Sequence, residues 1–307
     1  MPSFMSSSPT QTPVSLSEAY AHCTALTKAH YENFPVGWLM PKAKIRHVHA
    51  IYAFARHTDD LADEGYASGH DFGGEIPPQP TPAERLAALE KWEVGLADPA
   101  AAEMANEPIL IALHATIKEL DLPKSLFTDL LSAFQQDVVK TRYANQAEIL
   151  DYCRRSANPI GRLVLLLNGH RDEEKFRQSD AICTGLQVAN FWQDISVDLL
   201  KDRIYLPQDE MAALGVTVDD LKAGRSTPAF RTLVENQVAK AWALFDEGKG
   251  LSKTLPIPLK WEIAVTWLGG TTILKKIEAL DYDTLRTRPK LSKFDIPLLF
   301  LRTLLTF

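Results

Sequence analysis

The sequence predicts an all-α protein. Apolar residues recur every three to four positions through most of its 307 residues, which is the spacing of amphipathic helices. Runs that alternate apolar and polar residues, as half-buried strands do, are almost absent. The composition changes nowhere along the chain after its first residues, so we expect one large helical domain with an extensive buried core.

The expected elements begin after a leader. Residues 1–14 are rich in Ser, Thr and Pro and lack an apolar run, which predicts a disordered leader and not a signal peptide. Residues 15–307 then form the single domain. Its ten expected helices cover approximately residues 16–33, 42–65, 83–96, 103–120, 124–142, 146–169, 173–201, 227–252, 256–280 and 292–306.

Prolines mark most of the boundaries between these helices. Proline has no backbone N–H to donate, so it is favoured at helix starts and in connections. The boundary prolines are Pro35, Pro41, Pro123, Pro207, Pro256 and Pro258. The Asn158-Pro159 step falls inside the expected helix 146–169 and predicts a bend, which either exposes polar groups to a cavity or is a structural kink.

Two segments allow two interpretations each. Residues 65–82 are dense in Gly and Pro, and a mobile loop near a functional mouth and a passive surface insertion explain them equally well. The C-terminal helix 292–306 has a strongly apolar face. We expect this face to pack over the core, and the alternative is a peripheral contact with a lipid bilayer.

Charge and cysteine content limit the function classes. With 33 basic and 39 acidic residues the net charge is −6, which argues against nucleic-acid partners because phosphate binding needs clustered Lys and Arg. Cys23, Cys153 and Cys183 are too scattered for a disulfide framework or a zinc site. No apolar run reaches the about 18 residues of a spanning helix. We expect a cytoplasmic protein, at most peripheral to the inner membrane.

The expected helix 42–65 carries a first acidic cluster. Asp59 and Asp63 are four residues apart and share one helix face, with Arg56 and Tyr52 on nearly the same stripe. Two carboxylates on an inward face require a cation, and Mg²⁺ takes such oxygen ligands together with phosphate oxygens. A solvated helix end would explain this cluster if it stood alone.

A second acidic cluster, in the expected helix 173–201, again has two aspartates four residues apart. Gln187, Asn190, Asp194 and Asp198 follow spacings of three, four and four, which makes one polar stripe on an otherwise apolar helix. Two such helices facing each other would surround Mg²⁺ ions and a diphosphate with four carboxylates. Further candidates for contact with phosphate oxygens follow the stripe, namely Lys201, Arg203 and Tyr205.

These residues resemble the squalene/phytoene synthase family. The resemblance is carried by both aspartate clusters, by the Tyr-Ala-Phe-Ala-Arg run that ends at Arg56, and by the Arg-Ile-Tyr-Leu-Pro run over residues 203–207. It extends from about Ser15 to Arg288. The resemblance implies the isoprenoid-synthase helical bundle around a central active-site cavity, in which the aspartates bind Mg²⁺ and a prenyl diphosphate.

The resemblance also implies roles for individual residues. The implied catalytic residues are Tyr52, Arg56, Asp59, Asp63, Asp194 and Asp198. The implied substrate-binding residues are His30, Phe34, Arg56, Gln187, Asn190, Arg203, Tyr205 and Arg288, with Arg286 as the alternative to Arg288. The implied metal ligands are Asp59, Asp63, Asn190, Asp194 and Asp198.

Residues 33–36, 152–161 and 190–194 resemble one branch, the hydroxysqualene synthases of bacterial hopanoid clusters, which take presqualene diphosphate. Gln193 stands where condensing members usually carry Arg, and Val197 replaces an acidic residue. Without this guanidinium the site has less positive charge beside the metal, which suits one bound diphosphate better than two. We therefore expect a lyase that ionises presqualene diphosphate with Mg²⁺ and Arg56 and captures the rearranged cation with water, giving hydroxysqualene.

Two other functions stay open. One is a prenyltransferase that joins two farnesyl diphosphates to presqualene diphosphate or squalene, or two geranylgeranyl diphosphates to phytoene. The other is a non-catalytic assembly factor, which the retention of both aspartate pairs disfavours. No Gly-x-Gly-x-x-Gly follows a strand, so use of NADPH is disfavoured. Neighbouring enzymes of the squalene pathway are expected as partners besides the prenyl diphosphate.

Overall fold

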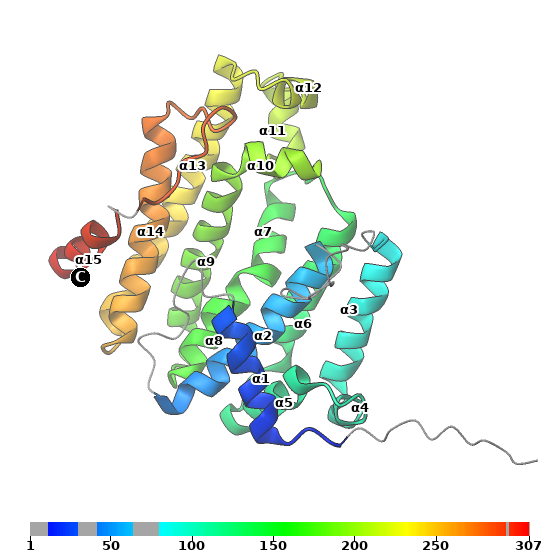
Figure 1. The fold of residues 1–307 in the computed structure, drawn as a ribbon. Helices are drawn as coiled ribbons and strands as arrows, with labels where there is room; N and C mark the ends of the chain where they lie inside the picture. Colours follow the sequence, from blue (N-terminus) through cyan, green and yellow to red (C-terminus); the bar gives the residue numbers. More distant parts are fainter. Residues whose placement is uncertain (1–11, 30–41, 64–79, 293–294, 307) are drawn as a thin grey trace, which may run out of the picture. The chain divides into compact units, whose positions relative to one another are not determined.

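The computed structural model describes residues 12–29, 42–63, 80–292 and 295–306 (Figure 1). Helices account for most of these residues. The described ranges contain no β-sheet, and their one isolated β-bridge joins Arg142 and Ile204. The predicted all-α class is therefore confirmed. The chain divides into two compact units, the first ending at Leu122 and the second beginning at Pro123. The single domain expected over residues 15–307 therefore stays a prediction.

The first unit contains five described helices. These are α1 (Leu16–Ala29), α2 (Lys42–Asp63), α3 (Pro82–Ala97), α4 (Pro99–Met104) and α5 (Pro108–Leu120). α1 packs on α2 and α5, and α2 also packs on α3 and α5. Phe54, Leu89 and Leu113 are fully buried among them, so burial of the apolar helix faces stabilises this unit.

One predicted helix of the first unit is wrong at its start. The prediction of a single helix over residues 103–120 merges α4 with α5. Asn106 adopts a left-handed backbone conformation with φ 54°, and the Glu107 side chain accepts a hydrogen bond from the Ile109 amide. Pro108 then occupies the first turn of α5, where its missing N–H has no cost.

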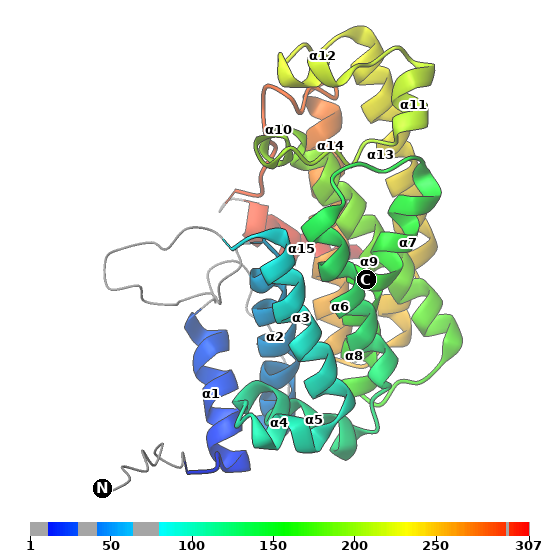
Figure 2. The same cartoon turned by 90° about the vertical axis from the view of Figure 1, so that its right-hand side faces the viewer.

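The second unit is built around α9. Its described elements are α6 (Lys124–Val139), α7 (Gln146–Ser156), α8 (Asn158–Leu167), α9 (Glu173–Gln193), α10 (Ile195–Asp198), η1 (Leu199–Lys201), α11 (Gln208–Ala213), α12 (Val218–Lys222), α13 (Pro228–Gly248), η2 (Leu251–Thr254), α14 (Leu259–Ala279) and α15 (Asp295–Thr306). α9 contacts α7, α8, α13 and α14, so four helices surround the helix that leads into the second aspartate cluster (Figure 2).

Three predictions for the second unit need correction. The expected helix 146–169 is two helices, because α7 ends at Ser156 and α8 begins at Asn158. The Asn158 Oδ1 accepts a hydrogen bond from Thr184 of α9 at 2.9 Å, which supports a structural kink. The expected helix 173–201 ends at Gln193, and α11 and α12 were missed because each spans less than two turns.

The C-terminal helix α15 packs on α14. Leu299 and Thr303 are buried, and Lys276 of α14 forms an ion pair with Asp295 at 3.1 Å. The expected packing of this helix is thus supported. None of the helices in the described part of the chain combines the length and the apolar character that crossing a membrane requires.

Candidate active site

The first aspartate pair lies in the last two turns of α2. Asp63 is the final residue of this helix, and Asp59 lies one turn earlier. The C-terminus of a helix carries a partial negative charge that disfavours carboxylates. Arg85 of α3 offsets part of this charge, since its Nη1 donates a hydrogen bond to the backbone oxygen of Ala62 at 2.6 Å. A carboxylate pair at such a position favours a bound cation.

Arg56 is held by the carboxylates that follow it on α2. Its Nη2 lies 2.6 Å from Oδ1 of Asp60, and its Nη1 lies 4.0 Å from Oδ2 of Asp59. The Asp60 side chain is 3% exposed, whereas the Arg56 side chain is 39% exposed. Asp60 therefore anchors the guanidinium from its buried side, and the exposed part of Arg56 is accessible to an anion.

The other predicted residues of the first unit are only partly described. Tyr52 is half-buried on α2, one turn before Arg56, as the predicted stripe requires. His30 and Phe34 lie outside the described residues, as do residues 64–79 of the predicted loop. The roles of these two residues and of the loop stay predictions.

The second aspartate pair lies where α9 ends. Asp194 directly follows α9, and Asp198 is the last residue of α10. The Asp194 amide donates to the Asn190 carbonyl and the Asp198 amide donates to the Asp194 carbonyl, both at 2.9 Å. This backbone bonding preserves the four-residue helical relation that the sequence predicted. Gln187 is half-buried two turns before Asp194.

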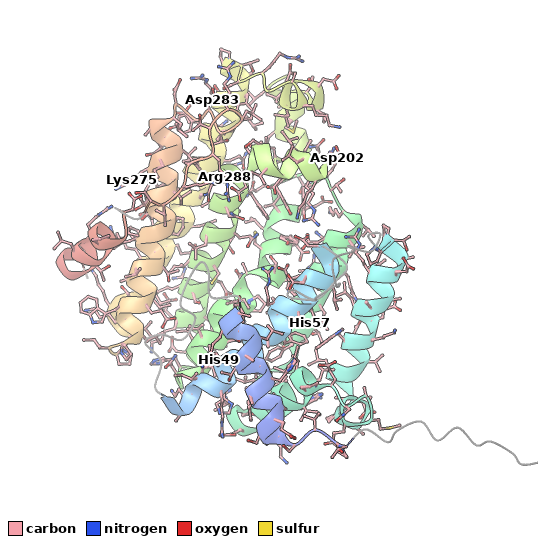
Figure 3. All side chains as sticks on the ribbon, viewed as in Figure 1. His49, His57, Asp202, Lys275, Asp283 and Arg288 are labelled. Atoms are coloured by element: carbon pink, nitrogen blue, oxygen red, sulfur yellow. The ribbon has the colours of Figure 1, made fainter. Side chains whose placement is uncertain are left out.

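Arg288, labelled in Figure 3, lies in the segment between α14 and α15. Its side chain contacts Asp194. Its Nε lies 2.5 Å from Oδ1 of Asp194 and its Nη2 lies 2.9 Å from Oδ2, which is the two-pronged geometry that guanidinium and carboxylate favour. Asn190 adds a hydrogen bond from Nδ2 to Oδ2 of Asp194 at 3.0 Å. The hydrogen bonds to Asp194 raise the pKa of Arg288.

Arg288, and not Arg286, contacts the aspartate cluster. The Arg286 side chain is 65% exposed, and its nearest carboxylate is that of Asp283 at 3.8 Å. The Arg288 side chain is 35% exposed and its partner Asp194 is 14% exposed. The sequence left this choice open because both residues belong to one irregular segment.

Arg203 and Tyr205 line a small pocket together with Asp198, and the Arg203 amide donates to the Asp198 carbonyl at 2.9 Å. Both residues also lie close to Asp137 of α6. Arg203 Nη2 donates to the backbone oxygen of Asp137 at 3.1 Å, and the Tyr152 hydroxyl donates to Oδ2 of Asp137 at 2.7 Å. Tyr205 is buried and stacks on Phe191 of α9, with 3.6 Å between the ring centroids. Burial raises the pKa of Tyr205, so its hydroxyl stays protonated and able to donate.

The sequence analysis did not select Asp60, Asp137 or Tyr152. Arg56 precedes Asp60 by four residues, which is the spacing of a helical ion pair and was a usable signal. Asp137 interrupts an apolar helix face, and a carboxylate at such a position is seldom buried without a partner. Tyr152 begins the stretch 152–161 that carried the resemblance, but no spacing rule connects it to Asp137.

The expectation of a Mg²⁺ site can be compared with the groups around Asp194. No three His, Cys, Asp or Glu side chains gather closely enough to hold a metal ion, as far as the described residues go. The two aspartate pairs lie in different units, so the predicted site of four carboxylates stays a prediction. A carboxylate has about four acceptor positions. Asp194 accepts three hydrogen bonds from Arg288 and Asn190, which leaves room for a cation.

Comparisons with known proteins agree on one family. A model of the squalene/phytoene synthase family matches residues 26–295. The chain is 31% identical to the hydroxysqualene synthase of Sinorhizobium fredii, over 86% of this chain and 85% of that protein. It is 30% identical to phytoene synthase 2 of Solanum lycopersicum, over 94% and 92% of the two chains. The crystal structure of squalene synthase HpnC from Alicyclobacillus acidocaldarius is similar with a TM-score of 0.76 and 39% identity, covering 88% and 97% of the two chains.

Proposed function

The chain belongs to the squalene/phytoene synthase family, and we propose that its reaction within this family is the conversion of presqualene diphosphate to hydroxysqualene. The observation that carries the proposal is the guanidinium of Arg288 on Asp194, next to a Gln193 side chain that brings no charge and binds the backbone oxygen of Pro289. A site for one diphosphate needs fewer cations than a site for two. The similarity to a hydroxysqualene synthase supports this reading.

Mg²⁺ is the cation proposed for the carboxylates. Its preferred oxygen ligands match Asp59 and Asp63 in the first unit and Asn190, Asp194 and Asp198 in the second. When bound, Mg²⁺ would stabilise the negative charge that develops on a departing diphosphate.

Two arginines supply fixed positive charge. An arginine has five N–H donors, and Arg288 uses two nitrogens on Asp194 while its side chain remains 35% exposed. It can therefore bind phosphate oxygens without releasing its carboxylate. Arg56 is 39% exposed and anchored by Asp60 in the same manner. Anchoring removes rotamer freedom before the substrate arrives, which lowers the entropy lost on binding.

The proposed reaction begins with cleavage of the bond between carbon and the bridging oxygen of presqualene diphosphate. The diphosphate leaves with the electron pair, and a cyclopropylcarbinyl cation remains. The cation rearranges, the oxygen of a water molecule adds to it, and that oxygen loses a proton to solvent. Arg288 would hold the leaving group and slow its return to the cation.

Turnover of two substrates tests this proposal. Purified protein with Mg²⁺ should convert presqualene diphosphate to hydroxysqualene and leave farnesyl diphosphate unchanged. The variant Asp194→Asn should lower kcat by about a hundredfold or more, because it removes a charge from the metal ligands. Asp219→Asn, an exposed carboxylate of α12 in the same unit, is the matched control and should retain activity.

Head-to-head condensation is the competing outcome. Conversion of farnesyl diphosphate to presqualene diphosphate, or of geranylgeranyl diphosphate to phytoene, with presqualene diphosphate left unchanged, would contradict the proposed reaction. Full activity of Asp194→Asn in a complementation assay would favour a non-catalytic role.

A further inference from the structure

Two consecutive residues at the end of α9 hold two consecutive residues of the segment between α14 and α15. Gln193 donates a hydrogen bond from Nε2 to the backbone oxygen of Pro289 at 2.6 Å. Asp194 binds the guanidinium of Arg288 at 2.5 and 2.9 Å. The segment is thus fixed to α9 at adjacent points, one on its backbone and one on a side chain.

Pro289 is the point where this segment meets the body of the unit. Pro289 is buried, whereas Thr287, Arg288 and Lys290 are exposed. Residues 286–292 form no helix of their own, so regular backbone hydrogen bonds do not fix them. A contact to the Pro289 carbonyl therefore has a large effect on where its neighbours lie.

The Arg288-Pro289 step transmits that contact to the guanidinium. The proline ring fixes φ of Pro289, and steric contact with the ring restricts Arg288 to extended conformations. Holding the Pro289 carbonyl thus also restricts where the backbone of Arg288 can lie. The ion pair with Asp194 holds the guanidinium itself, and the Gln193 contact holds the backbone from which the Arg288 side chain extends.

Gln193 is suited to this task by its position and its lack of charge. Its amide is long enough to reach the Pro289 oxygen and adds no second cation that would compete with Arg288 for Asp194. A glutamine also donates without titrating near neutral pH. The contact selects residue 288 over residue 286, whose side chain lies near Asp283.

We propose that Gln193 is a positioning residue, which fixes the Arg288-Pro289 step so that Arg288 is presented to the diphosphate. This inference rests on the proposed function, since it assigns to Arg288 a phosphate group as its ligand. The chemistry concerned is that of a magnesium diphosphate, for which inorganic pyrophosphate is a suitable probe.

The test uses the full chain and a double-mutant cycle. Gln193→Met keeps the length of the side chain and removes the donor, and Arg288→Met removes the guanidinium. Isothermal titration with Mg²⁺ and inorganic pyrophosphate should show affinity about tenfold weaker for each single variant. The double variant should be no weaker than Arg288→Met alone, because Gln193 acts through Arg288. Additive losses, or an unchanged affinity of Gln193→Met, would overturn the proposal.

A matched control and a second measurement separate the possible failures. Gln178 lies 15 positions earlier on α9 (193 − 178 = 15) and also donates a side-chain hydrogen bond, to Glu174 at 2.9 Å. Gln178→Met should bind pyrophosphate as the wild type does. The signal of the Arg288 Nε–H group in ¹H–¹⁵N NMR spectra should move toward that of a solvent-exposed arginine in Gln193→Met and stay unchanged in Gln178→Met.

Together the two measurements show whether a negative result contradicts the positioning role or the proposed function. An unchanged Arg288 Nε–H signal in Gln193→Met would contradict the positioning role, whatever the wild type binds. A moved signal together with no binding of magnesium pyrophosphate by the wild type would instead contradict the proposed function, and with it the assignment of phosphate to Arg288.

Discussion

Gly270 of α14 allows a close approach of three helices, and its replacement by alanine should destabilise the protein. A Cβ at this position would lie 2.4 Å from Cζ of Phe245 on α13 and 2.7 Å from Cδ2 of Leu186 on α9. Phe245 is fully buried, so its ring has no free space into which to move. The neighbouring Gly269 is the matched control, because the nearest atom to its added Cβ is Cδ1 of Leu291 at 3.9 Å.

The two alanine variants differ in steric cost alone. Alanine is favoured over glycine inside a helix by about 1 kcal/mol, and both variants receive this gain. Overpacking of a core costs about 1–3 kcal/mol, and the contacts at Gly270 place it at the upper end. Gly269→Ala should therefore be about 2–3 kcal/mol more stable than Gly270→Ala, and Gly270→Ala should be less stable than the wild type.

Thermal unfolding followed by circular dichroism measures this difference. About 1 kcal/mol corresponds to about 2 °C in a domain of this size, so the Tm values of the two variants should differ by about 5 °C. Equal Tm values, or a Tm of Gly270→Ala above that of the wild type, would show that the α9, α13 and α14 interface is looser than the distances indicate.

Three further predictions concern charged and polar side chains. Asp60→Asn removes a buried partner of Arg56 and should lower the free energy of unfolding by about 1 kcal/mol in urea titrations. The cost is small because the Arg56 side chain is 39% exposed and water can solvate it. An unchanged urea midpoint would refute the anchoring role of Asp60. Burial lowers the pKa of His47, so the unfolded chain binds a proton at a higher pH than the folded chain does, and stability should fall as pH drops below about 6.5. Between pH 7.5 and 5.5 the Tm of His47→Gln should therefore fall less than the Tm of the wild type. Equal decreases in Tm would contradict this. Arg288→Met should weaken binding of magnesium pyrophosphate about tenfold while Arg286→Met leaves it unchanged, and the reverse order would show that the wrong arginine was chosen.

The sequence predicted the helices where periodicity and punctuation agreed. The long helices α2, α13 and α14 lie close to their expected ranges, because each has an apolar face longer than two turns. α9 begins where it was expected and ends early, at Gln193. The errors have local causes. The expected helix 103–120 was drawn across Pro108, which begins a new helix. The expected helix 146–169 was drawn across Asn158, whose side chain bonds to Thr184 of α9.

The relation of Asn190, Asp194 and Asp198 was predictable because a helical backbone places residues four apart on one face. Backbone bonds between residues four apart continue from α9 through Asp194 into α10, and the roles of these residues stay predictions. The contacts of Arg288 with Asp194 and of Gln193 with Pro289 join residues more than 90 positions apart. No periodicity in a single sequence encodes such contacts, because they depend on how an irregular segment lies against α9.

Isotope labelling of the product tests the central claim most directly. Presqualene diphosphate and Mg²⁺ would be incubated with the protein in water enriched in oxygen-18, and the alcohol and the released diphosphate analysed by mass spectrometry. Ionisation followed by water capture predicts hydroxysqualene with one labelled oxygen and diphosphate with none, since the bond between carbon and oxygen breaks. An unlabelled presqualene alcohol, with the label in the phosphate product, would show attack at phosphorus and would contradict the account.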